Sequence, residues 1–260
     1  MHNFLKQKLA AGGIAKFMSL RQMRTADAAF IVRESGFDGF YIDCEHGVFS
    51  LREASDLCMA ASACGITPLV RVHTASVGTI GTMLDAGACG IIVPHVSTAV
   101  DAAEAVALAK YPPLGRRSVA ALGPTSGYKK VPIAESVRLR NDSVMVIAMI
   151  ETAEGVKNAD AIAAVPGIDA LMMGPADLSL ELGIAGQVRH AQICAAYFSA
   201  ADAARRHGKH FVAGAAGGPD IGELIARGAR IVMGGNDTAY LMQSLAQAAE
   251  AMDKAIKGQG

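Results

Sequence analysis

The sequence predicts a single-domain α/β fold, a (β/α)8 TIM barrel with one parallel sheet closed on itself. Eight short apolar runs recur along the chain, and most are separated by one amphipathic or Ala-rich stretch of helical length. Strands buried on both faces that alternate with helices are typical of parallel sheets. Eight such units in 260 residues match the usual size of this barrel.

The predicted strands are rich in Val, Ile, Met and Phe. In chain order they are IAKFMSL (14–20), GFYIDC (39–44), TPLVRV (67–72), CGIIVP (89–94), VMVIAMI (144–150), DALMMG (169–174), HFVAG (210–214) and RIVMGG (230–235). The clearest helices between them are 52–64, 98–110 and 152–165. Gly often closes a helix or opens the next strand, as at Gly65, Gly87, Gly167, Gly208 and Gly228, which is typical of helix C-caps.

An open, doubly wound sheet is the alternative architecture. Such a sheet usually carries a Gly-rich nucleotide-binding turn after its first strand, and the sequence contains neither GxGxxG nor a Walker motif. No linker or change of composition divides the chain, so residues 1–260 are expected to form one domain. The longest interruption, 111–142, lies between the fourth and fifth strands and is expected to overlie the active site.

Composition argues against several classes of partner. Hydrophobic residues make up 52% of the chain and the formal net charge is zero, so there is no basic face for nucleic acid or an anionic membrane. No apolar run reaches the length of a membrane span, and the N-terminus lacks the apolar core of a signal peptide. The five cysteines have no metal-binding spacing and are expected to be reduced, which favours a cytoplasmic location.

Polar side chains follow the predicted strands at their carboxyl ends, where barrel enzymes place their active sites. These are Asp43, Glu45 and His46 after the second strand, Arg71 and His73 at the third, His95 after the fourth, Glu151 after the fifth and Asp177 after the sixth. We therefore expect carboxylates, an arginine and a histidine to converge on one rim.

Glu151 and Asp177 lie one βα unit apart and so follow adjacent strands, whose axes are about 4.8 Å apart. Two carboxylates this close repel each other, and a divalent cation such as Mg²⁺ or Mn²⁺ would remove the conflict. The alternative is that Glu151 begins a helix and Asp177 caps another. Arg71 suits an anionic substrate oxygen or an enolate, and its alternative is a salt bridge to Asp43 or Glu45.

Several segments resemble the HpcH/HpaI aldolases over nearly the whole chain. They are FDGFYIDCEHG (37–47), VRV (70–72), GIIVPHVSTAVDAAEAVALAKYPPLGRRS (90–118), IETAEGVKNADAIAAVPGIDALMMGPADLS (150–179) and GNDTAYL (235–241). The pairing of IET with GPADLS is the most specific of these. The resemblance implies a class II, metal-dependent pyruvate aldolase on a TIM barrel, like the 4-hydroxy-2-oxoheptanedioate and 2-dehydro-3-deoxyglucarate aldolases.

The resemblance also implies roles for individual residues. Glu151 and Asp177 match the ligands of a Mg²⁺, Mn²⁺ or Co²⁺ ion, and Arg71 matches the arginine that stabilises the pyruvate enolate. His46 matches the histidine that assists proton transfer, and Asp43 an acidic residue that supports the site. The turn Gly174-Pro175-Ala176-Asp177 matches the segment whose backbone amides bind the pyruvate carboxylate.

Assembly is a further implication. Asp85 matches an aspartate that pairs with the histidine of a neighbouring subunit, and it ends the helix after the third strand, far from its own rim. The alternative is an ordinary surface aspartate. Relatives suggest a homo-oligomer, a hexamer built as a trimer of dimers, and a C-terminal helix over about 237–257 is expected to pack on a neighbouring subunit.

The expected reaction is the reversible cleavage of a 4-hydroxy-2-oxo acid to pyruvate, or a similar 2-oxo acid, and an aldehyde. One alternative keeps the same enolate but reaches it by decarboxylating oxaloacetate. Another, from a different class, is a non-catalytic metabolite-binding barrel. The segments AALGPTSGY (120–128) and GAAGGPD (214–220) depart from the family pattern around the second substrate, so the aldehyde partner stays open.

Overall fold

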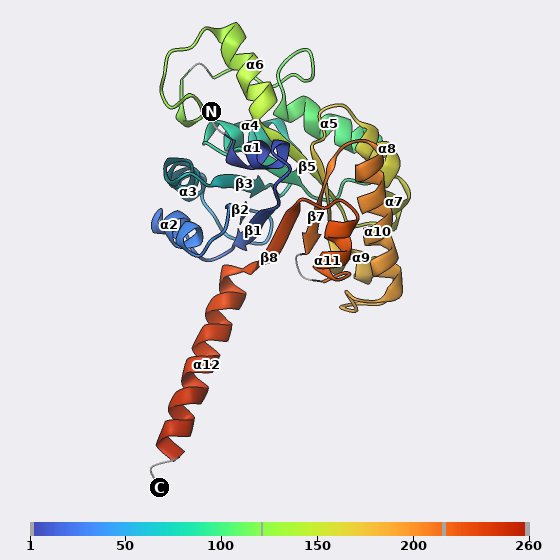
Figure 1. The fold of residues 1–260 in the computed structure, drawn as a ribbon. Helices are drawn as coiled ribbons and strands as arrows, with labels where there is room; N and C mark the ends of the chain where they lie inside the picture. The colour runs from blue at the N-terminus through green and yellow to red at the C-terminus, as the bar shows by residue number, and fades with distance from the viewer. Residues whose placement is uncertain (1–2, 121, 215–216, 258–260) are drawn as a thin grey trace.

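The computed structural model describes residues 3–120, 122–214 and 217–257. Residue 121 of AALGPTSGY and residues 215–216 of GAAGGPD lie outside this part of the chain. Eight parallel strands form a closed barrel in which each strand pairs with the next and β8 pairs with β1 (Figure 1). The predicted (β/α)8 barrel is therefore confirmed.

Each strand lies within one residue of its predicted bounds. The strands are β1 (Ala15–Leu20), β2 (Gly39–Asp43), β3 (Thr67–Arg71), β4 (Gly90–Val93), β5 (Met145–Ile150), β6 (Ala170–Met173), β7 (His210–Gly214) and β8 (Ile231–Asn236). The helices are α1 (Phe4–Ala10), α2 (Asp27–Glu34), α3 (Leu51–Cys64), α4 (Val77–Asp85), α5 (Ala99–Ala109), α6 (Ile133–Ser143), α7 (Ala153–Lys157), α8 (Ala159–Ala164), α9 (Pro175–Glu181), α10 (Ala191–Arg206), α11 (Ile221–Ala226) and α12 (Asp237–Lys257), with a 3-10 turn at Pro124–Ser126.

Local sequence signals explain where several of these elements begin and end. Ser50 forms a capping box with Glu53 at the start of α3, and Gly65 ends this helix with φ of 85°. The helix predicted over 152–165 is instead two helices, α7 and α8, because the chain leaves helical geometry at Asn158. The side chain of Asn158 donates a hydrogen bond to the carbonyl oxygen of Ser97, at 2.8 Å.

Along most strands, alternate residues enter two separate hydrophobic cores, as the pleat of a strand requires. Along β5, Met145, Ile147 and Met149 belong to the core inside the barrel, whereas the residues between them pack outward with the helices. Leu5 and Leu9 of α1 join the inner core, so α1 closes the barrel at the end where the strands begin. The opposite end is left for the polar residues of the rim.

The prediction that segment 111–142 overlies the active site is wrong. Helix α5 has already returned the chain to the end where the strands begin before this segment starts. The Lys110 ammonium there donates hydrogen bonds to the carbonyl oxygens of Asn141 and Val144, and Lys6 of α1 donates one to the carbonyl oxygen of Asp142. The long connection follows a helix rather than a strand, so it lies at the end remote from the rim.

Helix α12 leaves the barrel and projects away from it (Figure 1). Asp237 at its start is buried and accepts hydrogen bonds from the backbone amides of Arg21, Gln22 and Met23. The rest of the helix is largely exposed, including the apolar side chains of Leu241, Met242, Leu245, Met252 and Ile256. Among the described residues, none of the helices has the length and apolarity needed to span a bilayer.

Candidate active site

The last residues of β2 and β3 form a buried ion pair at the rim. Asp43 and Arg71 are paired in the register of the two strands. Arg71 donates from Nε to Asp43 Oδ1 at 2.9 Å and from Nη2 to Asp43 Oδ2 at 2.6 Å. The side chain of Asp43 is fully buried and that of Arg71 is 7% exposed. This bidentate geometry fixes the plane of the guanidinium group.

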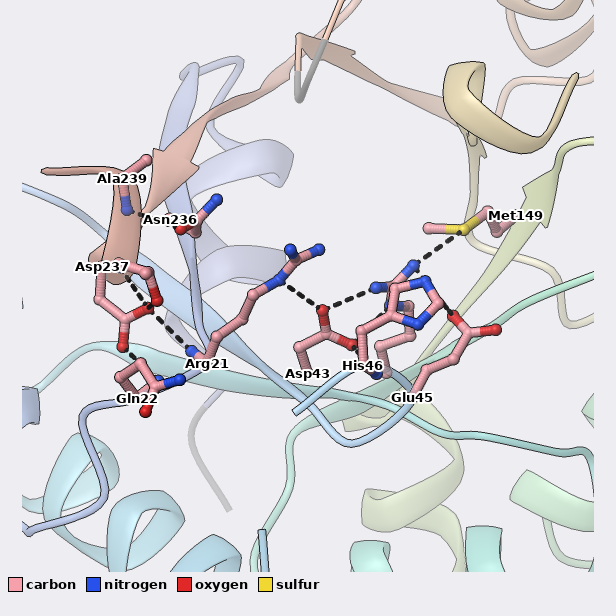
Figure 2. A network of polar contacts seen from close by, with 11 residues as sticks. Arg21, Gln22, Asp43, Glu45, His46, Met149, Asn236, Asp237 and Ala239 are labelled. Carbon is pink, nitrogen blue, oxygen red and sulfur yellow. Dashed lines mark hydrogen bonds and ion pairs between the residues drawn. The ribbon is translucent and has the colours of Figure 1, made fainter. Parts of the chain in front are cut away.

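Asp43 is also bound from a second side. Arg21, which follows β1, donates from Nε to Asp43 Oδ2 at 3.0 Å, and the backbone amide of His46 donates to Asp43 Oδ1 at 3.2 Å (Figure 2). Burial alone raises the pKa of Asp43, but the hydrogen bonds and charge of Arg71 outweigh it and hold that pKa below its usual value. Asp43 is therefore held by hydrogen bonds from Arg71, Arg21 and the His46 amide, and it anchors Arg71 at the rim.

The remaining nitrogen of Arg71 faces the centre of the site. Arg71 Nη1 lies 2.9 Å from Glu45 Oε2 and 3.7 Å from the sulfur of Met149 inside the barrel. Both salt bridges that were the alternative for Arg71 are thus present. Within the described part of the chain, Glu45 Oε2 is buried and makes no hydrogen bond of good geometry, so its contact with Arg71 is an ion pair alone.

Glu45, His95 and Glu151 form a cluster of possible metal ligands. One ligand atom from each lies within 4.8 Å of the others. His95 Nδ1 is 3.1 Å from Glu151 Oε1, and His95 Nε2 is 3.2 Å from Glu45 Oε1. The backbone amide of His95 also donates to Glu151 Oε1 at 2.7 Å. Ends of β2, β4 and β5 therefore meet at this point.

Glu151 is buried directly after β5 and before α7, so it begins no helix. Its carboxylate lies against the backbone of Gly174, where a Cβ atom would overlap Glu151 Oε2. Burial raises the pKa of Glu151, and the charges of Glu45 and Asp177 raise it further, against the hydrogen bond and charge of His95. A cation at this position would relieve the conflict among the three carboxylates.

Asp177 lies in the first turn of α9, where it is partly exposed. Gly174 precedes this helix without a side-chain cap, so Asp177 does not have the capping role that was its alternative. Pro175 has no N–H, so the first-turn amides of α9 that can donate are those of Ala176 and Asp177. The charge of Asp177 raises the pKa of Glu151, but among the described residues Asp177 is not part of the cluster formed by Glu45, His95 and Glu151.

His46 and Asp85 are less constrained. The His46 side chain is 52% exposed, and its Nε2 lies 4.0 Å from Glu45 Oε2. Asp85 is the last residue of α4 and is not brought to its own rim. Its Oδ1 accepts a hydrogen bond from the buried Arg117 at 2.6 Å. The pairing of Asp85 with a histidine of another subunit stays a prediction.

Comparisons with known proteins show the family to which the chain belongs. The model of the HpcH/HpaI aldolase/citrate lyase family matches residues 17–244. The chain belongs to this family. A crystal structure of an HpcH/HpaI aldolase from Desulfitobacterium hafniense DCB-2 is 36% identical, covers 96% of this chain and 97% of its own, and superposes with a TM-score of 0.92.

Curated relatives of this HpcH/HpaI family member carry aldolase names. A 4-hydroxy-4-methyl-2-oxoglutarate aldolase of Hapsidospora irregularis is 39% identical over 209 residues, which is 80% of this chain and 77% of the relative. A hydroxypyruvate/pyruvate aldolase of Pseudomonas aeruginosa is 34% identical over 255 residues, covering 95% of this chain and 91% of the relative.

Three residues of this HpcH/HpaI site received no role from the sequence. Glu45 and His95 were recognised as rim residues, but only the structure brings both against Glu151 and Arg71. Arg21 directly follows the apolar run FMSL and could have been found as the rim residue of the first strand. Its contact with Asp43 depends on the closing of the barrel, which no local pattern reveals.

Proposed function

We propose that this protein is a divalent-metal-dependent aldolase, a class II aldehyde-lyase. It would reversibly cleave a 4-hydroxy-2-oxo acid to pyruvate, or a similar 2-oxo acid, and an aldehyde. The observation that carries the proposal is a buried, oriented arginine, Arg71, beside three carboxylates at one barrel rim. Membership of the HpcH/HpaI family and the aldolase names of its relatives support it.

The residues present fit a divalent cation. Glu45 Oε2 is buried without a hydrogen bond among the described residues, and Glu151 is buried beside two further carboxylates. Oxygen-rich donor sets of this kind suit Mg²⁺, Mn²⁺ or Co²⁺. Glu151 and Asp177 would hold the ion, which supplies Lewis-acid polarisation of the substrate keto oxygen.

Arg71 would stabilise the negative charge that develops on the keto oxygen when the C3–C4 bond breaks. Two of its nitrogens are held by Asp43, so the guanidinium is already oriented. Its third nitrogen, Nη1, faces Glu45 at 2.9 Å and would turn part of this contact over to the substrate oxygen. A donor held in place before the reaction costs no reorganisation as charge develops. The amides of Ala176 and Asp177 would bind the substrate carboxylate at the start of α9.

His46 would move the proton of the 4-hydroxyl group. Its imidazole is exposed at the rim, so it can meet a substrate that enters from solvent. Asp43 holds the His46 backbone and not its ring. A carboxylate from outside the subunit, which we propose is Asp85 of another copy, would then orient the imidazole.

We propose a homo-oligomer, built as a hexamer from three dimers, in which α12 packs on a neighbouring subunit. The exposed apolar side chains of α12, among them Leu241, Leu245 and Ile256, support this arrangement, because a monomer would leave them in water. Asp85 is partly exposed at the end of α4, where a neighbouring subunit can reach it. A cytoplasmic location is also proposed, since the five cysteines are free.

The test is a panel of 4-hydroxy-2-oxo acids assayed for pyruvate release with and without EDTA. Chelation is expected to abolish cleavage, and Mg²⁺, Mn²⁺ or Co²⁺ to restore it. Borohydride is expected to trap no Schiff base. Oxaloacetate is assayed in parallel, so that decarboxylation is separated from aldol cleavage. Full cleavage activity in EDTA would contradict the proposed class of aldolase.

A further inference from the structure

Arg21 is held at the mouth of the barrel by two acidic side chains. Its backbone amide donates a hydrogen bond to Asp237 Oδ1 at 2.9 Å, and its Nε donates one to Asp43 Oδ2 at 3.0 Å. Asp43 and Asp237 are both buried, so the backbone and the guanidinium group of Arg21 are each tied to a buried acceptor. An arginine held in this way loses little conformational freedom when it binds a ligand.

The two terminal nitrogens of Arg21 are left unused. A guanidinium group has five N–H donors, and the contact with Asp43 engages only the one on Nε. In the part of the chain that the structure describes, Nη1 and Nη2 have no hydrogen-bond or ion-pair partner, and Figure 2 shows them directed away from Asp43. The side chain is 38% exposed, so a molecule from solvent can reach them. Such a pair of nitrogens matches the two oxygens of a carboxylate.

Arg21 lies beside the groups that would act on the aldehyde half of the substrate. Arg21 Nε and Arg71 Nη2 bind the same oxygen, Asp43 Oδ2, at 3.0 Å and 2.6 Å. The backbone amide of His46 binds the other oxygen at 3.2 Å. In the proposed reaction Arg71 faces the oxygen on C2 and His46 the hydroxyl group on C4. Arg21 therefore lies next to the carbons beyond C4, which come from the aldehyde.

The distribution of charge around the rim favours an anion at Arg21. Arg21 follows β1, whereas Glu151 and Asp177 follow β5 and β6, and β5 lies opposite β1 in the closed barrel. A carboxylate on the aldehyde is repelled by the acidic side of the rim and attracted to the guanidinium group on the other side. A neutral aldehyde gains nothing from the unused Nη groups.

We infer that Arg21 is a specificity-determining residue whose two Nη groups bind a carboxylate on the aldehyde half of the substrate. The inference rests on the proposed aldolase function and adds the chemical class of the aldehyde to it. The aldehyde joined to pyruvate is a short oxo acid, so the full substrate carries a carboxylate at each end. Because Arg21 and Arg71 share one oxygen of Asp43, the distal carboxylate lies only a few bonds beyond C4.

The test is the condensation of pyruvate with two matched pairs of aldehydes, glyoxylate with acetaldehyde and succinic semialdehyde with butanal. Within a pair, a carboxylate replaces a methyl group. The wild-type protein is expected to show the higher kcat/KM for the charged member of at least one pair. Raising the KCl concentration from about 0.1 M to about 1 M shortens the Debye length from about 10 Å to about 3 Å and should reduce this preference.

Two variants locate the preference at Arg21. Arg21→Gln should lower kcat/KM for the charged aldehyde about tenfold or more, because hydrogen bonds to a charged group are lost, and change it less than about threefold for the neutral aldehyde. Arg21→Lys should lie between, since it keeps the charge without the planar fork. Arg24→Gln is the matched control. Arg24 lies close in sequence with a 35% exposed side chain, but it contacts Glu53 and the ring of Phe49, so its loss should leave the preference unchanged.

Exchange of the methyl protons of pyruvate with D₂O, followed by NMR without any aldehyde, reports on the pyruvate half alone. This exchange should be equal in the wild type and in Arg21→Gln. If exchange and condensation with both aldehydes fall together, Arg21 acts only by holding Asp43, which refutes the inference and leaves the proposed aldolase intact. A wild type without the preference, or an Arg21→Gln variant that retains it, refutes the inference as well. If the wild type neither exchanges nor condenses pyruvate, the proposed function fails and the inference fails with it.

Discussion

Replacing Asp43 with Asn tests whether the arginine at the centre of the site is held by a buried charge. The substitution keeps the size and shape of the side chain. An amide oxygen at the Oδ1 position can still accept from Arg71 Nε and from the His46 amide. The amide nitrogen then replaces Oδ2 and faces two donors, Arg71 Nη2 and Arg21 Nε. The charge-assisted hydrogen bonds from Arg71 Nη2 and Arg21 Nε are lost, and the new N–H group of the amide faces these two donors.

The expected cost follows from burial. A hydrogen bond to a charged group contributes about 1.5–3 kcal/mol, and removing one partner of a buried ion pair costs about 3–5 kcal/mol. Because Asp43 is fully buried and Arg71 is 7% exposed, solvent screens the pair little. We expect Asp43→Asn to lower the free energy of unfolding by about 3–5 kcal/mol. At roughly 2 °C for each kcal/mol in a chain of this size, Tm falls by about 6–10 °C.

The pH dependence gives a second measure of the same interaction. Burial raises the pKa of Asp43, but Arg71 more than offsets this, so the folded pKa lies below the ordinary value of 3.8. A carboxylate with a depressed folded pKa stabilises the fold fully above its ordinary value, and this stabilisation is lost as the pH falls through the folded pKa. The difference in the free energy of unfolding between wild type and Asp43→Asn should therefore be constant from about pH 5 upward and shrink only in stronger acid.

Urea unfolding followed by circular dichroism at several pH values makes the measurement. The control is Asp56→Asn, which breaks an exposed ion pair with Arg52 and should leave the midpoint unchanged within error. The reasoning is refuted if Asp43→Asn loses less than about 1 kcal/mol at pH 7, the scale of a surface pair. It is equally refuted if the difference in the free energy of unfolding between wild type and Asp43→Asn disappears as the pH falls from about 7 to about 5.

Three further outcomes are expected. Arg71→Ala should lower kcat by about 100-fold or more. Arg71→Lys should restore little of this loss, because lysine lacks the planar pair of donors. A kcat within threefold of wild type in steady-state kinetics would make Arg71 a structural residue. Gly174→Ala should weaken metal binding by about tenfold, because the new Cβ displaces the Glu151 carboxylate, while the circular dichroism spectrum stays unchanged. Wild-type affinity measured by calorimetry would contradict this. Inactive Asp85→Asn and inactive His46→Ala chains should regain activity when mixed, since some interfaces then pair two wild-type residues; no recovery despite demonstrated subunit exchange would make Asp85 a residue of its own subunit alone.

The sequence by itself determined the barrel and the residues of its rim. Each strand is a short apolar run, and burial on both faces is a local property that the residue types report directly. The rim follows from the same reasoning, because the residue after a parallel strand must lie at the carboxyl end of the sheet. Glu151 and Asp177 were placed after adjacent strands in this way, one βα unit apart, and in the structure they follow β5 and β6.

Only the tertiary structure decided which rim residues contact one another. The partners of Asp43 come from β3 and from the turn after β1, and those of His95 follow β2 and β5. Such contacts depend on the closing of the barrel and on the direction of each side chain, which an apolar run does not encode. The left-handed backbone of His95 likewise has no signal in VPHV, because His adopts that conformation only where the surrounding fold holds it.

The placement of the long segment 111–142 shows the same limit. The length of this segment was visible in the sequence. The end of the barrel at which it lies depended on whether a helix had already carried the chain back from the rim, and α5 does so before residue 111. Helix α12 is a similar case. Its apolar side chains were visible in the sequence, yet only the structure shows that they leave their own barrel. Local patterns report which residues avoid water, whereas the direction in which an element leaves the core is set by contacts between segments distant in the chain.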